Sequence, residues 1–144
     1  MNEAALTVPC PNCNTLNRVP RERLEDHPKC GKCKQALFTA HPNELSALNF
    51  EQQIGGDVPT VVDFWAPWCG PCGTMAPHFE SAASQLEPQA RLAKLNTEAE
   101  PQLAARFNIR SIPTVVIFRR GQEVARQSGA VDAANLVRWV RTSA

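Results

Sequence analysis

The chain has 144 residues, with 15 Lys and Arg against 14 Asp and Glu, and a formal net charge of +1. This balance gives no general preference for nucleic acid, anionic membranes or acidic substrates. The length allows one domain of ordinary size plus a small appendage.

Nothing in the sequence indicates export or membrane insertion. No segment approaches the roughly 18 consecutive apolar residues that span a bilayer. Residues 1–7 lack the basic and apolar regions of a signal peptide. We therefore expect a cytoplasmic protein that binds neither membrane nor nucleic acid.

All six cysteines occur as Cys-x-x-Cys pairs. In a reducing compartment such pairs are more often metal ligands or catalytic thiols than structural disulfides. Two pairs lie in a segment with few large apolar residues, and the third lies where strand and helix patterns alternate. We place the boundary near Ala40–Pro42, which gives a domain at residues 1–42 and a domain at residues 43–144.

The first two pairs have the spacing C-x2-C-x16-C-x2-C, which is typical of a zinc ribbon. Residues 8–38 hold too few apolar side chains to bury a core unaided, so we expect a metal to stabilise them. Four thiolates make a closed tetrahedral site, which indicates one structural zinc per chain. Iron, two disulfides or four free thiols are the alternatives. The predicted ligands are Cys10, Cys13, Cys30 and Cys33. The three histidines are expected at the surface.

Beyond residue 44 the sequence predicts alternating strands and helices that end in a hairpin and a final helix. This order implies an α/β fold with a mixed sheet and helices on both of its faces. The predicted strands cover residues 45–48, 58–66, 91–95, 114–118 and 123–127, and the predicted helices cover 49–54, 73–87, 101–107 and 133–140.

Four local signals refine the helices. Asn49 and Gln52 have the spacing of a capping box at the first helix, and Gly55 is expected to stop that helix. Pro77 lies inside the predicted helix 73–87 and predicts a kink. Asp132 is placed to cap the last helix.

The third pair, Cys69 and Cys72, lies between a predicted buried strand and a predicted helix. We expect Cys69 in the first helical turn, where the helix dipole favours a thiolate. Cys72 then lies on the same helical face, so an intrachain disulfide is within reach. In the expected reaction Cys69 attacks a substrate disulfide, and Cys72 resolves the mixed disulfide. The alternatives are a third metal knuckle, for which only His78 is a nearby further ligand, or a resting pair of core thiols.

Asp63 interrupts a predicted strand of apolar residues, where an ionised carboxylate is costly unless it is paired. Burial would raise its pKa and suit it to exchange protons with Cys72. A carboxylate satisfied by backbone N–H groups is the equal alternative, and Lys94 is a candidate charge partner. The peptide bond before Pro113 is left open between cis and trans by the residues alone.

Residues 63–72, Asp-Phe-Trp-Ala-Pro-Trp-Cys-Gly-Pro-Cys, resemble the thioredoxin family, together with Pro77, Ile112-Pro113-Thr114 and Gly129-Ala130. The resemblance covers about residues 44–144 and implies a thioredoxin fold. It implies that Cys69 is the exposed nucleophile, Cys72 the buried resolving thiol and Asp63 the buried acid–base group, and that Pro113 is cis. It also implies a docking surface for substrate proteins around the dithiol: Trp68, Gly70, Pro71, Ile112, Pro113 and Gly129.

A zinc ribbon ahead of this domain resembles the second class of bacterial thioredoxins, the thioredoxin 2 group. That resemblance implies a protein-disulfide reductase that takes electrons from the flavoprotein thioredoxin reductase and acts on oxidised client proteins. We expect a monomer that uses no organic cofactor. Gly73 and Pro67 stand where charged residues are common in the family. Their presence is expected to raise the Cys69 pKa slightly and to make the disulfide less oxidising.

Two other functions would use the same residues. In a redox-gated holdase or interaction module, oxidation would release zinc from the N-terminal segment and expose a client-binding surface. A disulfide oxidase or isomerase shares the fold but normally works outside the cytoplasm, and the absent signal peptide argues against it.

Overall fold

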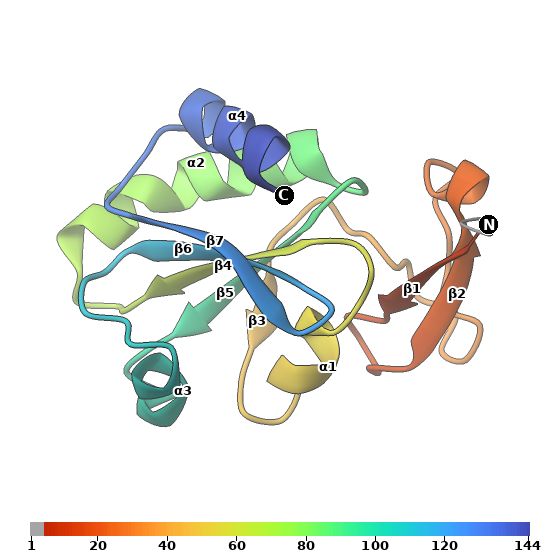
Figure 1. Cartoon of the computed structure of the whole chain (residues 1–144), viewed down its shortest axis with the longest axis horizontal. Coiled ribbons are helices and arrows are strands. Elements are labelled where there is room, and N and C mark those ends of the chain that lie inside the picture. Colours follow the sequence, from red (N-terminus) through yellow and green to blue (C-terminus); the bar gives the residue numbers. More distant parts are fainter. Residues whose placement is uncertain (1–4) are drawn as a thin grey trace.

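The computed structural model describes residues 5–144, which form two parts packed side by side (Figure 1). The smaller part, called the ribbon (residues 5–42), contains the antiparallel strands β1 (Ala5–Pro9) and β2 (Leu16–Pro20) and the short 3-10 helix η1 (Arg21–Arg23). The larger part, residues 43–144, is built on a five-stranded sheet of order β3-β5-β4-β6-β7.

The sheet is mixed, as the sequence predicts: β3, β5 and β4 run parallel, whereas β4, β6 and β7 pair antiparallel. Its strands are β3 (Asn43–Leu45), β4 (Thr60–Trp65), β5 (Arg91–Asn96), β6 (Thr114–Arg119) and β7 (Gln122–Ser128). The helices are α1 (Phe50–Ile54), α2 (Gly70–Leu86), α3 (Pro101–Arg106) and α4 (Ala133–Ser143). Within residues 5–144, no helix combines the length and the apolar character that crossing a membrane requires.

Side-chain alternation along β4 divides the core into two layers, because successive residues of a strand point to opposite faces. Val61 packs in the cluster beneath α2 and α4. Val62 and Phe64 pack in the cluster beneath α1 and α3. Asp63 shares the parity of Val61, so this carboxyl group lies on the face that α2 covers.

The first helix and strand of the larger part differ from the prediction. The strand is β3 at Asn43–Leu45, not residues 45–48, because the chain turns at Ser46. Asn49 precedes α1, but the predicted capping box with Gln52 was wrong. The Asn49 side chain instead accepts a bond from the Ser46 N–H at 2.8 Å and donates to the Glu44 carbonyl at 3.1 Å, which closes that turn.

Other local signals agree with the structure. Gly55 ends α1 as predicted. Pro77 lies inside α2 as expected, and the kink there stays a prediction. The Asp132 carboxylate accepts a bond from the Asn135 N–H at 2.9 Å, which confirms its predicted cap of α4. One histidine was placed wrongly: His78 is half-buried, and its Nδ1 accepts the N–H of Ala133 at 3.2 Å.

A buried polar cluster joins the ribbon to the sheet. Arg91, at the start of β5, is only 2% exposed. Its guanidinium donates to the Pro9 carbonyl at 2.6 Å and also to the Leu37 carbonyl, both in the ribbon. Gln53 of α1 donates to the Cys10 carbonyl at 2.9 Å and accepts from Arg91 at 3.2 Å. These bonds fix the first cysteine knuckle against the sheet.

Candidate functional site

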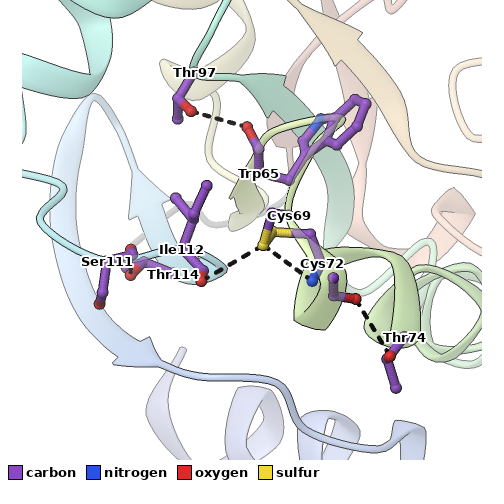
Figure 2. The surroundings of a disulfide bond; sticks show 9 residues. Trp65, Cys69, Cys72, Thr74, Thr97, Ser111, Ile112 and Thr114 are labelled. Atoms are coloured by element: carbon purple, nitrogen blue, oxygen red, sulfur yellow. Dashed lines mark hydrogen bonds between the residues drawn. A yellow bond between two sulfur atoms is a disulfide. The ribbon is translucent and has the colours of Figure 1, made fainter.

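Cys69 and Cys72 form a disulfide at the start of α2, with their Cα atoms 5.3 Å apart (Figure 2). Cys69 is the N-cap of α2 and does not lie in the first turn, because the helix begins at Gly70. Its Sγ accepts a hydrogen bond from the Cys72 N–H at 3.2 Å, the bond that Ser or Asp makes at this position. The sulfur therefore faces the unpaired amides of the helix end, which would stabilise a thiolate.

The dithiol directly follows an exposed aromatic residue in the chain. Trp68 is 71% exposed, whereas Cys69 is 7% and Cys72 3% exposed. Cys69 is thus less exposed than the resemblance implied, because the loop before β6 covers it and the second sulfur occupies one side. Gly70 and Pro71 are exposed beside it.

The loop before β6 places its backbone against the disulfide (Figure 2). The Ile112 carbonyl oxygen lies 3.7 Å from the Cys69 Sγ, and the Ile112–Pro113 peptide bond is cis, as the resemblance implied. The Thr114 hydroxyl donates to the Ser111 carbonyl at 2.6 Å and holds the loop. The Gly129 N–H donates to the Pro113 carbonyl at 2.9 Å, so Gly129 adjoins this loop.

Asp63 is 1% exposed, and neither carboxyl oxygen has a hydrogen-bond partner among residues 5–144. The alternative of a carboxylate satisfied by backbone N–H groups therefore does not hold for these residues. Burial raises the pKa of Asp63 to about 7, and the charge of Lys94 opposes that rise. Lys94 pairs with Asp63 in the strand register, and its ammonium lies 4.5 Å from the ring centroid of Trp65. The group can thus take up and release a proton near neutral pH.

The four remaining thiols gather at one end of the ribbon. The sulfur atoms of Cys10, Cys13, Cys30 and Cys33 all lie within 4.8 Å of one another. Two pairs of sulfurs, one sulfur from each knuckle, are 3.5 and 3.7 Å apart. Four sulfurs about 2.3 Å from a tetrahedral zinc are about 3.8 Å from one another. The donor set and its spacing therefore fit a structural zinc ion.

The two cysteine knuckles have the same backbone geometry. The Cys10 Sγ accepts the Asn12 N–H at 3.3 Å, and the Cys30 Sγ accepts the Lys32 N–H at 3.4 Å. The residue after each second cysteine is left-handed, with φ of 65° at Asn14 and 69° at Lys34. Hydrogen bonds from backbone N–H groups to sulfur stabilise the thiolate form of cysteine, which is the form that binds a metal.

The structure adds a groove that the sequence did not indicate. A cavity of about 380 Å³ lies beside the dithiol, between Trp68 and α3. Ala104 and Ile109 line it together with Ile112. The residues of α3 and of the loop after it belong to no recognisable motif, so the sequence did not indicate that they lie near the dithiol.

Comparison with known proteins decides the family. A family model described as Thioredoxin matches residues 41–142, which is more than half of the chain. The chain belongs to the thioredoxin family. A second model, described as Thioredoxin 2, N-terminal, matches residues 9–35 of this thioredoxin and carries the zinc-ribbon designation.

Relatives agree with the family assignment. Thioredoxin C-3 of Corynebacterium nephridii is 48% identical over 136 residues, which cover 94% of this chain and 93% of that protein. Thioredoxin 1 of a Nostoc species is 48% identical over 94 residues, covering 65% of this chain and 88% of that protein. The crystal structure of a Malassezia sympodialis thioredoxin (Mala s 13) has a TM-score of 0.64 and 33% identity over 69% of this chain and 88% of that one.

These findings confirm the predicted thioredoxin fold, the N-terminal zinc-ribbon domain and the family. They also confirm the predicted class of enzyme: the chain is a thiol–disulfide oxidoreductase.

Proposed function

We propose that this thioredoxin reduces disulfides in client proteins by cycling Cys69 and Cys72 between dithiol and disulfide. The observation that supports this most directly is the N-cap position of Cys69, directly after the exposed Trp68 in the chain, where its sulfur accepts the Cys72 N–H. A helix N-terminus lowers the pKa of a thiol that it faces, so the reduced Cys69 is a thiolate nucleophile.

The reaction has two exchange steps. The Cys69 thiolate attacks one sulfur of a client disulfide, forms a mixed disulfide and expels the other client sulfur as a thiolate. Cys72 then loses its proton and attacks the Cys69 sulfur, which re-forms the intrachain disulfide and releases the reduced client. Two electrons pass to the client, and the flavoprotein thioredoxin reductase returns two electrons to the disulfide.

Asp63 is the proton acceptor and donor for Cys72 in this proposal. Its side chain lies on the face of β4 that α2 covers, and burial raises its pKa to about 7. A carboxyl group of that pKa exchanges protons readily at neutral pH, which the resolving thiol needs.

Clients dock, in this proposal, on the surface around the disulfide. The exposed Trp68 directly precedes Cys69, the Ile112 carbonyl lies against the Cys69 sulfur, and Trp68 and Ile112 line one cavity. Gly129 has φ of 96° and is bonded to that loop, so an extended client backbone can approach closely there. Gly70 and Pro71 complete the surface.

The ribbon, in this proposal, is a structural domain that ends at residue 42 and holds one zinc ion per chain through Cys10, Cys13, Cys30 and Cys33. A closed set of four thiolates leaves no position open for substrate. The zinc supplies folding stability to the ribbon and takes no part in exchange. We place the protein in the cytoplasm as a monomer.

Insulin reduction with a dithiol donor tests the exchange reaction. Replacement Cys69→Ser should abolish the activity, since it removes the nucleophile. In the Cys72→Ser variant the mixed disulfide with the client should accumulate, because the resolving thiol is missing, and it should be visible on a non-reducing gel. Full activity in Cys69→Ser would refute the proposed nucleophile.

A redox-gated holdase is the second candidate, and the partial exposure of Cys13 and Cys33 favours it. An oxidant can reach these thiols, and the sulfurs of Cys10 and Cys33 are only 3.5 Å apart. Oxidised full-length protein should then lose zinc and suppress the aggregation of an unfolded client. Equal suppression by the reduced, zinc-bound protein would exclude gating.

A further inference from the structure

A second cavity of about 380 Å³ lies between the ribbon and the larger part of the molecule. It is formed by the end of α2, the end of α4, the β6–β7 turn and the first residues of the ribbon. Figure 1 shows α2 running from the dithiol end of the molecule toward the ribbon. Since α2 has 17 residues, the cavity is about 25 Å from the dithiol. Neither the exchange reaction nor the zinc site uses it.

Four arginines line this cavity from four different elements. They are Arg21 of η1, Arg119 at the end of β6, Arg120 of the following turn and Arg141 of α4. Among the described lining residues the acidic side chain is Asp57, and Arg119, Arg120 and Arg141 together exceed it by two positive charges. Like charges that converge in a concave site repel one another, and the field they produce attracts anions.

One of these arginines is held in an unfavourable backbone conformation. Arg120 and Gly121 form the two-residue turn between β6 and β7, with φ of 53° and 80°. Asn, Asp or Gly is favoured at the first position of such a turn, because a larger side chain is strained there. The turn is fixed by bonds from the Arg120 N–H to the Gly56 carbonyl at 3.0 Å and from the Gly121 N–H to the Ile54 carbonyl at 2.9 Å.

The carboxylate of Asp57, the acidic side chain in the cavity lining, already has hydrogen-bond partners within the protein. Asp57 accepts bonds from the Thr7 N–H at 2.8 Å and from the Arg120 guanidinium at 2.7 Å. It therefore orients Arg120 and offers little neutralisation to Arg119 and Arg141. A negatively charged ligand would neutralise the positive charges of Arg119 and Arg141.

The floor of the cavity is apolar. Leu6 of the ribbon, Leu86 of α2 and Val140 of α4 form it. A volume of about 380 Å³ is at the small end of the range for small-molecule sites, about 300–1,000 Å³. The site thus fits a compact molecule with a charged group and an apolar or planar body, not a polymer segment. Arginine is suited to phosphate because its planar guanidinium donates two parallel bonds.

We propose that this cavity binds a small organic phosphate with two or more negative charges. Its arginines hold the phosphates, and its apolar floor contacts the remainder of the ligand. Because Leu6 and Arg21 come from the ribbon, the site exists only in a thioredoxin that carries the docked ribbon.

Isothermal titration of the full-length, zinc-bound, oxidised protein tests the proposal. ADP is the probe, with pyrophosphate and adenosine as its separate halves, in about 0.15 M salt to screen distant charges. We expect saturable binding of one ADP per chain, weaker binding of pyrophosphate and no binding of adenosine. Absence of saturable ADP binding would overturn the proposal. If pyrophosphate binds as tightly as ADP, the apolar floor does not contribute to ligand binding, and that part of the proposal is overturned.

A matched pair of variants on α4 locates the site. Arg141→Gln removes one guanidinium from the cavity lining. It should weaken ADP binding about three- to fivefold, the effect expected for one exposed ion pair. Arg138→Gln, one turn away on the same helix and outside the cavity, should leave the affinity unchanged. Combining Arg119→Gln with Arg141→Gln should weaken ADP by about tenfold or more. Equal affinities of the wild-type protein and this double variant would overturn the assignment.

Discussion

The ribbon and the dithiol start from the same Cys-x-x-Cys spacing and reach different chemistry. In each ribbon knuckle the first sulfur accepts an N–H two residues on, as at Cys10 and Cys30, and the chain then reverses through a left-handed residue. At the dithiol, Cys69 accepts an N–H three residues on, and a helix of 17 residues continues. The backbone path after the pair, and the presence or absence of a second pair facing it, therefore decide between metal binding and redox exchange.

The largest effect should come from removing one ribbon thiol. Cys30→Ser leaves three ligands, and structural zinc contributes about 10–16 kcal/mol of binding free energy to small domains. We expect the variant to lose zinc and the ribbon amides to lose protection from hydrogen exchange. Cys69→Ser is the control and should keep its zinc and ribbon protection. Full zinc retention by Cys30→Ser would remove Cys30 from the ligand set.

The next effect tests how the two regions are joined. Arg91→Met removes the donors to the Pro9 and Leu37 carbonyls, and each buried carbonyl left unpaired costs about 1–3 kcal/mol. We expect the free energy of unfolding in urea to fall by about 3 kcal/mol or more. Arg138→Met, on the exposed face of α4, should change it by less than about 0.5 kcal/mol. Equal effects of the two variants would mean that Arg91 does not join the ribbon to the sheet.

A smaller, pH-dependent effect is expected at Asp63. Its pKa is raised to about 7 in the folded protein, so its neutral form is favoured and ionisation opposes folding. Wild-type stability should fall, relative to Asp63→Asn, as the pH rises from about 4 to about 7, and the difference should then level off near 2–4 kcal/mol.

Urea titrations of the oxidised proteins at several pH values measure this difference, since the disulfide removes the titration of Cys69 and Cys72. The same variant should resolve mixed disulfides more slowly at neutral pH. A stability difference independent of pH between 5 and 8 would mean that Asp63 does not ionise in that range.

The smallest effect concerns charge beside the dithiol. A Cβ atom at Gly73 would meet no atom within 4 Å beyond its own helix backbone and chain neighbours, so Gly73→Lys starts from open space. The added ammonium should lower the Cys69 pKa by a few tenths of a unit, as expected for an exposed charge. The pH dependence of alkylation of the reduced protein by iodoacetamide measures this shift. Ser84→Lys, near the far end of α2, should leave it unchanged.

Much of the redox site could be predicted because its signals are local. A carboxylate within an apolar strand identifies Asp63, and a cysteine pair between a strand and a helix identifies the dithiol. The exact N-cap position of Cys69 was missed, because the helix begins at Gly70 and Pro71, which add nothing to the apolar spacing from which the helix at 73–87 was predicted.

The contacts between the two parts could not be predicted. Arg91 is the first residue of a strand, where a charged side chain is normally in solvent, yet it is buried among partners from the ribbon and from α1. Gln53 looks like an ordinary polar residue of a short helix, and its side-chain partners are 38 to 43 residues away in the sequence. Long-range burial of this kind leaves no local pattern.

The buried Arg91 has a consequence for protein engineering. It recognises the ribbon through main-chain oxygens of Pro9 and Leu37, which every amino acid supplies. A foreign ribbon with the same knuckle path should therefore graft onto this sheet if it keeps an aromatic residue at the position of Phe38, whose ring centroid lies 5.0 Å from the guanidinium. Conversely, a fragment cut at residue 43 would leave a guanidinium without its carbonyl partners, and Arg91 would be the residue to replace when designing a minimal version.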